Sequence, residues 1–278
     1  KVVVDAVNSV GGTVIPALLK ALGVKEVVEL NCEPTGRFAH NPEPIPENLI
    51  QISEKIKECG ADLGIVVDPD VDRLALVCEN GEMFVEEYTL VAVADYVLKH
   101  TPGNTVSNLS SSRALRDVTL AHGQQYNAAA VGEVNVVTKM KETNTVIGGE
   151  GNGGVIYPES HYGRDALVGV GLFLSHFVAE GKSMTVLKAT YPQYFISKNK
   201  LTLSPDMDVD KILEGLKKKY ASEEITDIDG VKIDFKDGWV HLRKSNTEPI
   251  IRIYSESKDE AAANQLAEEV IKVAQSLY

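Results

Sequence analysis

The chain has 278 residues, a formal net charge of −12 and a hydrophobic content of 44%. This length allows two or three compact domains, and the acidic balance argues against nucleic acid or an anionic membrane as a partner. The sequence contains no apolar run of membrane-spanning length. Cys32, Cys59 and Cys78 show no C-x-x-C spacing, so we expect reduced thiols and a cytoplasmic protein. The chain opens with an apolar stretch and lacks an initial Met or a leader, which predicts a fragment of a longer protein.

The first two thirds of the chain alternate predicted strands and helices, which is typical of a parallel or mixed sheet with helices on both faces. The predicted strands are 2–6, 27–30, 63–67, 74–77, 105–109, 127–131 and 146–148. The predicted helices are 13–22, 47–59, 86–100, 112–122, 132–141 and 165–179. A Thr-Pro-Gly-Asn segment at 101–104 predicts a boundary between two such domains.

The last third follows a different pattern. Its predicted strands are 200–203, 231–235, 239–243 and 250–255, and its predicted helices are 209–220 and 259–277. In the final helix the predicted buried stripe consists of Leu266, Val270, Val273 and Leu277. The predicted fold class is therefore α/β: two α/β domains with mixed sheets, at 1–103 and 104–198, followed by a small α+β C-terminal domain at 199–278.

Residues 66–74 read Val-Val-Asp-Pro-Asp-Val-Asp-Arg-Leu, between two apolar runs that predict buried strands. Unpaired carboxylates are costly to bury, so Asp68, Asp70 and Asp72 need a shared counter-charge, and Mg2+ takes oxygen ligands of this kind. A polar turn explains one Asp but not three in register. An EF-hand would use the same spacing, with Glu79 at its last ligand position, but Arg73 stands where that loop needs Gly and the flanks are strands. We therefore predict a Mg2+ site with a position left for a phosphate oxygen.

Two later segments carry groups that suit a phosphosugar. Residues 148–155 place five glycines around Glu150 and Asn152, whose side chains can hydrogen-bond vicinal hydroxyls. Residues 243–252 place cations, hydroxyls and an amide in one predicted turn, a set that suits an oxyanion. By contrast, the Gly pair at 11–12 lacks the fuller nucleotide-binding fingerprints, and we interpret it as a structural turn rather than a phosphate cradle.

Together these segments resemble three loops of the phosphohexomutases, the superfamily of phosphoglucomutase, phosphomannomutase and phosphoglucosamine mutase. Asp-x-Asp-x-Asp-Arg resembles the family's metal loop, 148–154 its sugar-binding loop Gly-Glu-x-Ser/Asn-Gly, and 243–252 its phosphate-binding loop Arg-x-Ser-x-Thr-Glu-Pro…Arg. Arg164-Asp165 matches the family as well. The resemblance covers the whole chain, but only the second, third and fourth domains of the family.

The chain also departs from the family pattern. Pro69 and Val71 stand where the metal loop usually has Gly and Ala, and Gly154 stands where many members have His. The family's nucleophilic serine, in a Ser-His-Asn-Pro context, has no counterpart. Residues 38–42 read Phe-Ala-His-Asn-Pro, with Ala39 in place of that serine, and we interpret them as a loop near the substrate mouth.

The resemblance implies a phosphohexomutase: Mg2+-dependent phosphoryl transfer between O1 and O6 of a hexose phosphate, through a hexose bisphosphate and a phosphoserine in a first domain missing from this chain. The chain alone is then expected to be inactive. The resemblance implies that the domain at 1–103 binds the metal, the domain at 104–198 binds the sugar and the domain at 199–278 binds the phosphate. The implied site residues are Asp68, Asp70 and Asp72 for the metal, Arg73 as a catalytic cation, Glu150 and Asn152 for the sugar, and Arg243, Ser245, Asn246, Thr247 and Arg252 for the non-reacting phosphate.

Several alternatives stay open. His161 is either an acid–base group or a surface histidine paired with a carboxylate. The chain is alternatively a non-catalytic phosphosugar-binding protein, or a metal-dependent phosphatase with Asp68 as its nucleophile. The sugar (glucose, mannose or glucosamine) and the oligomeric state are not determined by these motifs.

Overall fold

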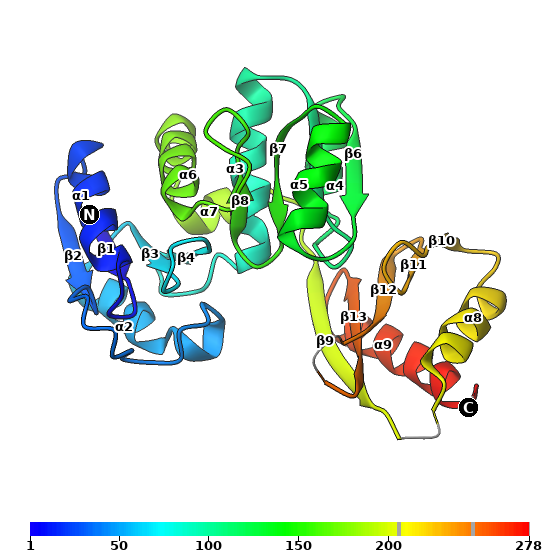
Figure 1. Ribbon diagram of the computed structural model, residues 1–278. Coiled ribbons are helices and arrows are strands. Elements are labelled where there is room, and N and C mark those ends of the chain that lie inside the picture. Colours follow the sequence, from blue (N-terminus) through cyan, green and yellow to red (C-terminus); the bar gives the residue numbers. More distant parts are fainter. Residues whose placement is uncertain (205–206, 246–247, 278) are drawn as a thin grey trace. The chain divides into compact units, whose positions relative to one another are not determined.

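The computed structural model describes residues 1–204, 207–245 and 248–277 (Figure 1). The chain divides into two compact units. The first unit consists of residues 1–128 and 132–192, and the second of residues 129–131 and 193–278. No helix in the described ranges combines the length and the apolar character that a membrane span requires.

The first unit contains two four-stranded sheets, and the first of them carries the acidic loop. Its strand order is β2-β1-β3-β4, with parallel strands β1 (Val2–Asp5), β2 (Val27–Leu30) and β3 (Leu63–Val67) and antiparallel β4 (Leu74–Cys78). Its connections contain α1 (Gly11–Ala21), the short 3-10 helix η1 (Pro46–Asn48) and α2 (Ile50–Cys59). Because β1 and β3 are parallel, their carboxyl ends meet at one edge of the sheet, where the acidic loop begins.

The second sheet of this unit has the order β6-β5-β7-β8. Its strands are β5 (Asn104–Asn108), β6 (Tyr126–Ala129), β7 (Thr145–Glu150) and β8 (Gly154–Ile156). The associated helices are α3 (Glu86–His100), α4 (Ala114–Ala121), α5 (Glu133–Glu142), α6 (Ala166–Glu180) and α7 (Met184–Lys188). α3 and α6 pack against each other, and each also contacts both β4 and β8 (Figure 1). These two helices therefore join the two sheets into one body.

The second unit is an antiparallel sheet with the order β10-β11-β12-β13-β9. Its strands are β9 (Phe195–Thr202), β10 (Glu224–Thr226), β11 (Val231–Phe235), β12 (Gly238–Lys244) and β13 (Ile250–Ser257). α8 (Val209–Lys219) and α9 (Glu260–Gln275) pack on one face and close an apolar core (Figure 1). In α9, Val270 is fully buried, and the other three residues of the predicted stripe pack partly buried against the same core.

The predicted fold class is confirmed: two mixed α/β sheets precede an antiparallel C-terminal sheet. The predicted start of β9 at residue 200 is wrong, because the strand begins at Phe195. The predicted end of β6 at 131 is also wrong, since it ends at Ala129. Helix α1 begins at Gly11, and a Cβ at Gly12 would lie 1.9 Å from the carbonyl oxygen of Cys32. The glycine pair therefore permits a close backbone contact. The division at residues 103 and 198 stays a prediction.

Candidate functional site

The three aspartates of the acidic loop come together between β3 and β4. One carboxylate oxygen from each of Asp68, Asp70 and Asp72 lies within 4.8 Å of the others. Asp68 is buried, Asp72 is half-buried and Asp70 is exposed. A set of carboxylate oxygens that opens to solvent on one side fits a hard cation such as Mg2+.

Asp68 is held by Arg73, which follows it in the same loop. Asp68 Oδ1 accepts hydrogen bonds from the backbone N–H groups of Asp72 and Arg73, both at 3.0 Å. Asp68 Oδ2 accepts one from Arg73 Nε at 2.6 Å. Burial alone would raise the pKa of Asp68, but the backbone N–H and the guanidinium of Arg73 outweigh it and keep this pKa below its usual value. Asp68 is therefore ionised at neutral pH and fixed in orientation.

Asp72 is in the opposite electrostatic situation. Burial and the neighbouring carboxylate of Asp68 raise the pKa of Asp72 to about 6, against the opposing charge of Arg164. Two carboxylates this close repel each other unless a cation is shared between them. A divalent cation bound at the loop would relieve that repulsion.

Arg164 connects the metal loop to the Gly-rich loop. Its Nη2 donates to Asp72 Oδ2, and its Nη1 donates to Glu150 Oε2 at 2.9 Å. Its Nε lies 3.6 Å from Glu133 Oε2, in the first turn of α5. One guanidinium thus neutralises part of the charge on carboxylates from three different segments, at a half-buried position where such pairs are worth more than at the surface.

The Gly-rich loop is fixed in place through Glu150, which is 5% exposed. Glu150 Oε1 accepts hydrogen bonds from Asn108 Nδ2 at 2.9 Å and from the Gly132 N–H at 3.2 Å. Asn152 is used locally, since its Oδ1 accepts from the Gly154 N–H at 3.1 Å. Glu150 is therefore held by hydrogen bonds from other segments of the chain, whereas the hydrogen bond of Asn152 lies within its own loop.

Backbone contacts join the two loops directly. The Leu74 N–H, just after the metal loop, donates to the carbonyl of Gly153 at 3.0 Å. Gly153 has a φ of +88°, and a Cβ there would lie 2.3 Å from the Leu74 oxygen, so this contact requires glycine. On the other side, the Ala166 N–H donates to the carbonyl of Val71 at 3.0 Å. The metal loop is thus fixed by segments far away in the sequence.

His161 pairs with a carboxylate, which was one of its two predicted alternatives. Its Nε2 lies 2.9 Å from Asp165 Oδ2, and its side chain is 49% exposed. The other oxygen of Asp165 accepts from the Leu167 and Val168 N–H groups and so caps α6.

The loop at residues 33–46 reaches the metal loop. Glu43 Oε1 lies 3.4 Å from Arg73 Nη1, and His40 Nε2 lies 3.1 Å from Asp5 Oδ2 at the end of β1. Residues 38–42 are thus part of a loop at the carboxyl edge of the first sheet.

In the second unit, Arg243 on β12 and Arg252 on β13 stand directly opposite each other. Arg252 Nη2 also pairs with Glu248 Oε2 at 3.3 Å. Ser245 is 6% exposed, and its Oγ accepts from the Glu248 N–H at 3.3 Å. The predicted residues Asn246 and Thr247 lie outside the described residues.

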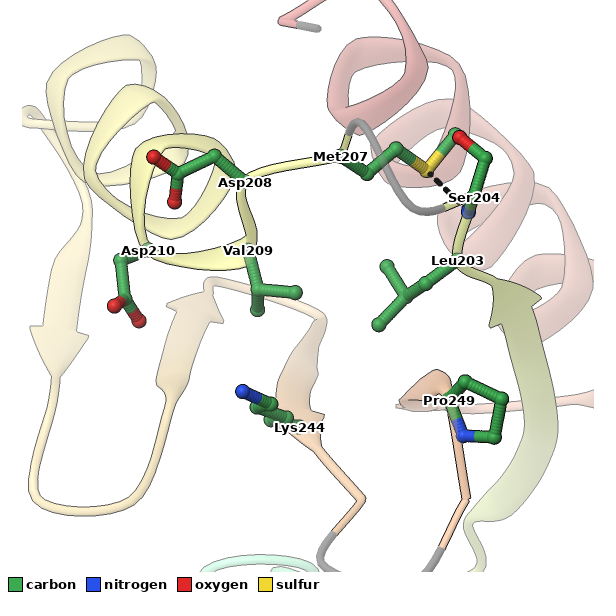
Figure 2. Close-up of a pocket in the computed structure, with 8 residues that line it drawn as sticks. All are labelled: Leu203, Ser204, Met207, Asp208, Val209, Asp210, Lys244 and Pro249. Atoms are coloured by element: carbon green, nitrogen blue, oxygen red, sulfur yellow. Dashed lines mark hydrogen bonds between the residues drawn. The ribbon is translucent and has the colours of Figure 1, made fainter.

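The second unit also contains a pocket of about 460 Å³, whose lining side chains are drawn in Figure 2. It is lined by Leu203, Ser204, Met207, Asp208, Val209, Asp210, Lys244 and Pro249. Two of its charged groups are carboxylates and one is an ammonium, so this pocket does not have the excess of cations that a phosphate requires. Lys244 lines this pocket, and because side chains alternate along a strand, Arg243 lies on the other face of β12.

Sequence models of three consecutive domains of one family match the chain. They are described as phosphoglucomutase/phosphomannomutase alpha/beta/alpha domain II (residues 1–81), alpha/beta/alpha domain III (residues 86–194) and C-terminal domain (residues 201–273). The chain belongs to the phosphoglucomutase/phosphomannomutase superfamily.

Known members of this superfamily are similar over nearly the full length of the chain. A Thermococcus kodakarensis protein named phosphoglucomutase/phosphomannomutase is 40% identical over 276 residues, which are 98% of this chain and 60% of that protein. A Methanopyrus kandleri protein named probable phosphoglucosamine mutase is 32% identical over 277 residues, 98% of this chain and 61% of that protein. A crystal structure of a family protein from Burkholderia thailandensis has a TM-score of 0.86 at 30% identity, and the match covers 99% of this chain and 60% of that one. The chain spans about three fifths of the length of these relatives.

One departure from the usual phosphohexomutase loops has a structural explanation, and a second places a residue in an unfavourable conformation. A Cβ at Gly154 would lie 2.4 Å from Arg164 Cδ, so the glycine leaves room for the arginine that bridges Asp72 and Glu150. Val71 has a φ of +62°, which a β-branched residue rarely adopts. Its backbone is held there by the bond from Ala166, so the surrounding fold imposes this conformation.

Proposed function

We propose that this chain forms the metal, sugar and phosphate sites of a phosphohexomutase that moves a phosphoryl group between O1 and O6 of a hexose phosphate. The observation that carries the proposal is the guanidinium of Arg164, which joins the acidic loop to Glu150 of the Gly-rich loop. Phosphoryl transfer depends mainly on positioning and charge neutralisation. Arg164 would hold the metal-binding loop and the sugar-binding carboxylate of Glu150 in a fixed relative position, which supports that chemistry.

Asp68, Asp70 and Asp72 would hold Mg2+, which when bound neutralises charge on the transferring phosphoryl group. Arg73 remains oriented by Asp68 and Glu43, so that its remaining N–H groups are available to a phosphoryl oxygen. Because Asp68 is buried and both its oxygens already accept hydrogen bonds, its geometry favours a ligand over the nucleophile of an Asp-dependent phosphatase.

Glu150 would accept a hydrogen bond from a sugar hydroxyl at Oε2, which accepts one bond from Arg164 Nη1 and so retains a lone pair, whereas Oε1 already accepts two bonds. Arg243, Ser245 and Arg252 would bind the phosphate that does not react, together with Asn246 and Thr247. Asn152 would have a secondary role, because its oxygen is engaged within its own loop. Remote binding of this kind accelerates the reaction only by positioning the reacting end of the sugar.

The phosphoryl donor would be a serine in a further domain outside these 278 residues. The chain alone would then bind metal and phosphosugar without turnover. The free thiols of its three cysteines support a reducing, cytoplasmic location. The names of the relatives include both phosphomannomutase and phosphoglucosamine mutase, so the hexose is left open within this class.

The test is a mutase assay on the full-length product of the gene, with Mg2+, a trace of hexose bisphosphate, and glucose, mannose and glucosamine 1-phosphates side by side. Turnover of at least one sugar, abolished by chelation of the metal, supports the proposal and identifies the substrate. A protein that binds these sugars but converts none of them is a binding protein instead. Turnover by the 278-residue chain alone would contradict the assignment of the donor serine to another domain.

A further inference from the structure

Three cations stand in one row across the antiparallel sheet of the second unit. In the strand register, Arg243 on β12 is directly opposite Arg252 on β13, and Arg252 is directly opposite Lys200 on β9. Side chains of directly opposite residues in antiparallel strands lie on the same face of the sheet. The ammonium group of Lys200 therefore lies on the same face of the sheet as the guanidinium groups of Arg243 and Arg252.

This row lies on the face that α8 and α9 do not cover. The residues next to the row in each strand, Leu242, Ile251 and Leu201, pack into the core under these helices. Because side chains alternate between the two faces of a strand, the row points the other way. Lys200 is exposed there and Arg252 is half-buried.

The row has more positive charge than the described carboxylates that pair with it can balance. Like charges directly opposite each other destabilise a pair of strands. Among the described residues, Glu248 forms the one ion pair found for Arg252, and none is found for Arg243 or Lys200. Arg243 Nε is buried and donates to no described atom. Although the chain has a net charge of −12, these three cations outnumber the carboxylates paired with them, so the local charge is positive and favours binding of an anion.

We propose that Lys200 is the third cation of the phosphate site and that it contacts the non-reacting phosphate of a hexose phosphate. This inference rests on the proposed function, because it assigns a further residue to the same site. The ligand is a phosphate monoester dianion, whose two negative charges balance the net charge of two guanidinium groups and one ammonium once the Glu248 carboxylate paired with Arg252 is counted. Lys200 lies on β9, which ends the strand order of the sheet, so it can reach a ligand without displacing another strand.

Lys244 provides a matched control. It carries the same charge as Lys200 and follows Arg243 directly, but it lines the pocket of Figure 2 on the helix-covered side of the sheet. Replacing either lysine by Ala changes the net charge by the same amount. A difference between the two variants therefore reports position in the row rather than overall charge.

The experiment is calorimetric titration of the 278-residue chain, at low salt, with glucose, mannose and glucosamine 6-phosphates in turn. We expect Arg243→Ala to weaken binding at least tenfold, because it removes a charge-assisted hydrogen bond of about 1.5–3 kcal/mol. Lys200→Ala should weaken binding roughly threefold, which is typical of an exposed ion pair. Lys200→Arg should restore the affinity, and Lys244→Ala should leave it unchanged. Melting temperatures of all variants verify that folding is intact.

The outcomes separate the inference from the proposed function. If Arg243→Ala weakens binding but Lys200→Ala does not, or if Lys244→Ala weakens it as much, the inference about Lys200 is overturned while the phosphate site stands. If the wild-type chain binds none of the three hexose 6-phosphates, or Arg243→Ala has no effect, the phosphate site of the proposed function is itself wrong.

Discussion

Arg164 and Asp72 form an ion pair between positions 92 residues apart in the sequence. The second terminal nitrogen of the same guanidinium holds Glu150 at 2.9 Å. One side chain thus connects the carboxylate proposed to bind the metal with the carboxylate proposed to bind the sugar. A lysine cannot make both bonds in the same geometry, because an ammonium is a point charge and not a planar fork.

Replacing Arg164 by Gln in the full-length enzyme should lower kcat/KM at least tenfold, since a hydrogen bond to a charged group contributes about 1.5–3 kcal/mol. Arg164→Lys should recover only part of the loss. Steady-state kinetics at saturating Mg2+ measures both. Arg116→Gln, on the surface of α4, is the control and should retain wild-type kinetics. Wild-type kcat/KM in Arg164→Gln would rule out a role for the bridge.

Asp70→Asn should separate metal binding from stability. Asp70 is exposed, and removing its charge relieves repulsion within the acidic loop, so the variant in EDTA should melt at or above the wild-type temperature. Added Mg2+ should raise the melting temperature of the wild type but not of the variant. A ligand at 100 times its Kd stabilises the native state by about 2.7 kcal/mol. Glu54→Gln, an exposed change in α2, should respond to Mg2+ as the wild type does. An unchanged response in Asp70→Asn would remove Asp70 from the ligand set.

His241 should make the second unit sensitive to acid. Burial lowers the pKa of His241 to about 4, and its Nε2 donates to the Asp229 carbonyl at 2.7 Å. The unfolded chain binds this proton near pH 6.5, so the stability contributed by neutral His241 is present above pH 6.5 and is lost as the pH falls towards 4. A difference of this size corresponds to at most about 3 kcal/mol of unfolding free energy.

Urea unfolding at pH 7.5 and 5.0 measures this effect. Fluorescence excited selectively at tryptophan reports on the second unit, because its buried Trp239 is the one tryptophan of the chain. His241→Gln should reduce the loss of stability between the two pH values, whereas His100→Gln at an exposed position should not. Equal pH dependence in wild type and His241→Gln would assign the acid sensitivity to another group.

Gly154→Ala should impair the site through Arg164. The added Cβ would lie 2.4 Å from Arg164 Cδ, so the arginine must move away from Asp72 or Glu150. We expect a loss of kcat/KM similar in direction to that of Arg164→Gln. Gly171→Ala in α6 is the matched control, because nothing lies within 4 Å of a Cβ there. If the double variant Gly154→Ala/Arg164→Gln lost the product of both single effects, the two residues would act independently.

The acidic loop could be predicted from the sequence because its signal is local. Three carboxylates at alternate positions between apolar runs are costly without a cation, and the flanking runs read as buried strands on both sides. The Arg243 turn was found in the same way, from its density of oxyanion donors. These motifs needed no knowledge of tertiary contacts.

The bridge through Arg164 could not be predicted, because its partners come from separate segments of the chain and only the fold brings them together. In the sequence, Arg164 stands out only as a match to the family beside Asp165. Lys200 was missed because its strand alternates weakly between polar and apolar residues, and its register with Arg252 is a tertiary property. The short elements β8, β10 and α7 were missed because three to five residues give too little periodicity.

The unfavourable backbone of Val71 limits where the proposed metal site can exist. Residues 66–74 keep their shape because Ser9 Oγ donates to the Pro69 carbonyl at 2.7 Å and the Ala166 N–H donates to the Val71 carbonyl. A peptide with this sequence lacks both contacts, and a β-branched residue would relax out of a positive φ. Transplanting these nine residues alone onto another β-hairpin would therefore transfer the three aspartates without their geometry. The β1–α1 connection and the start of α6 would have to be transplanted with them.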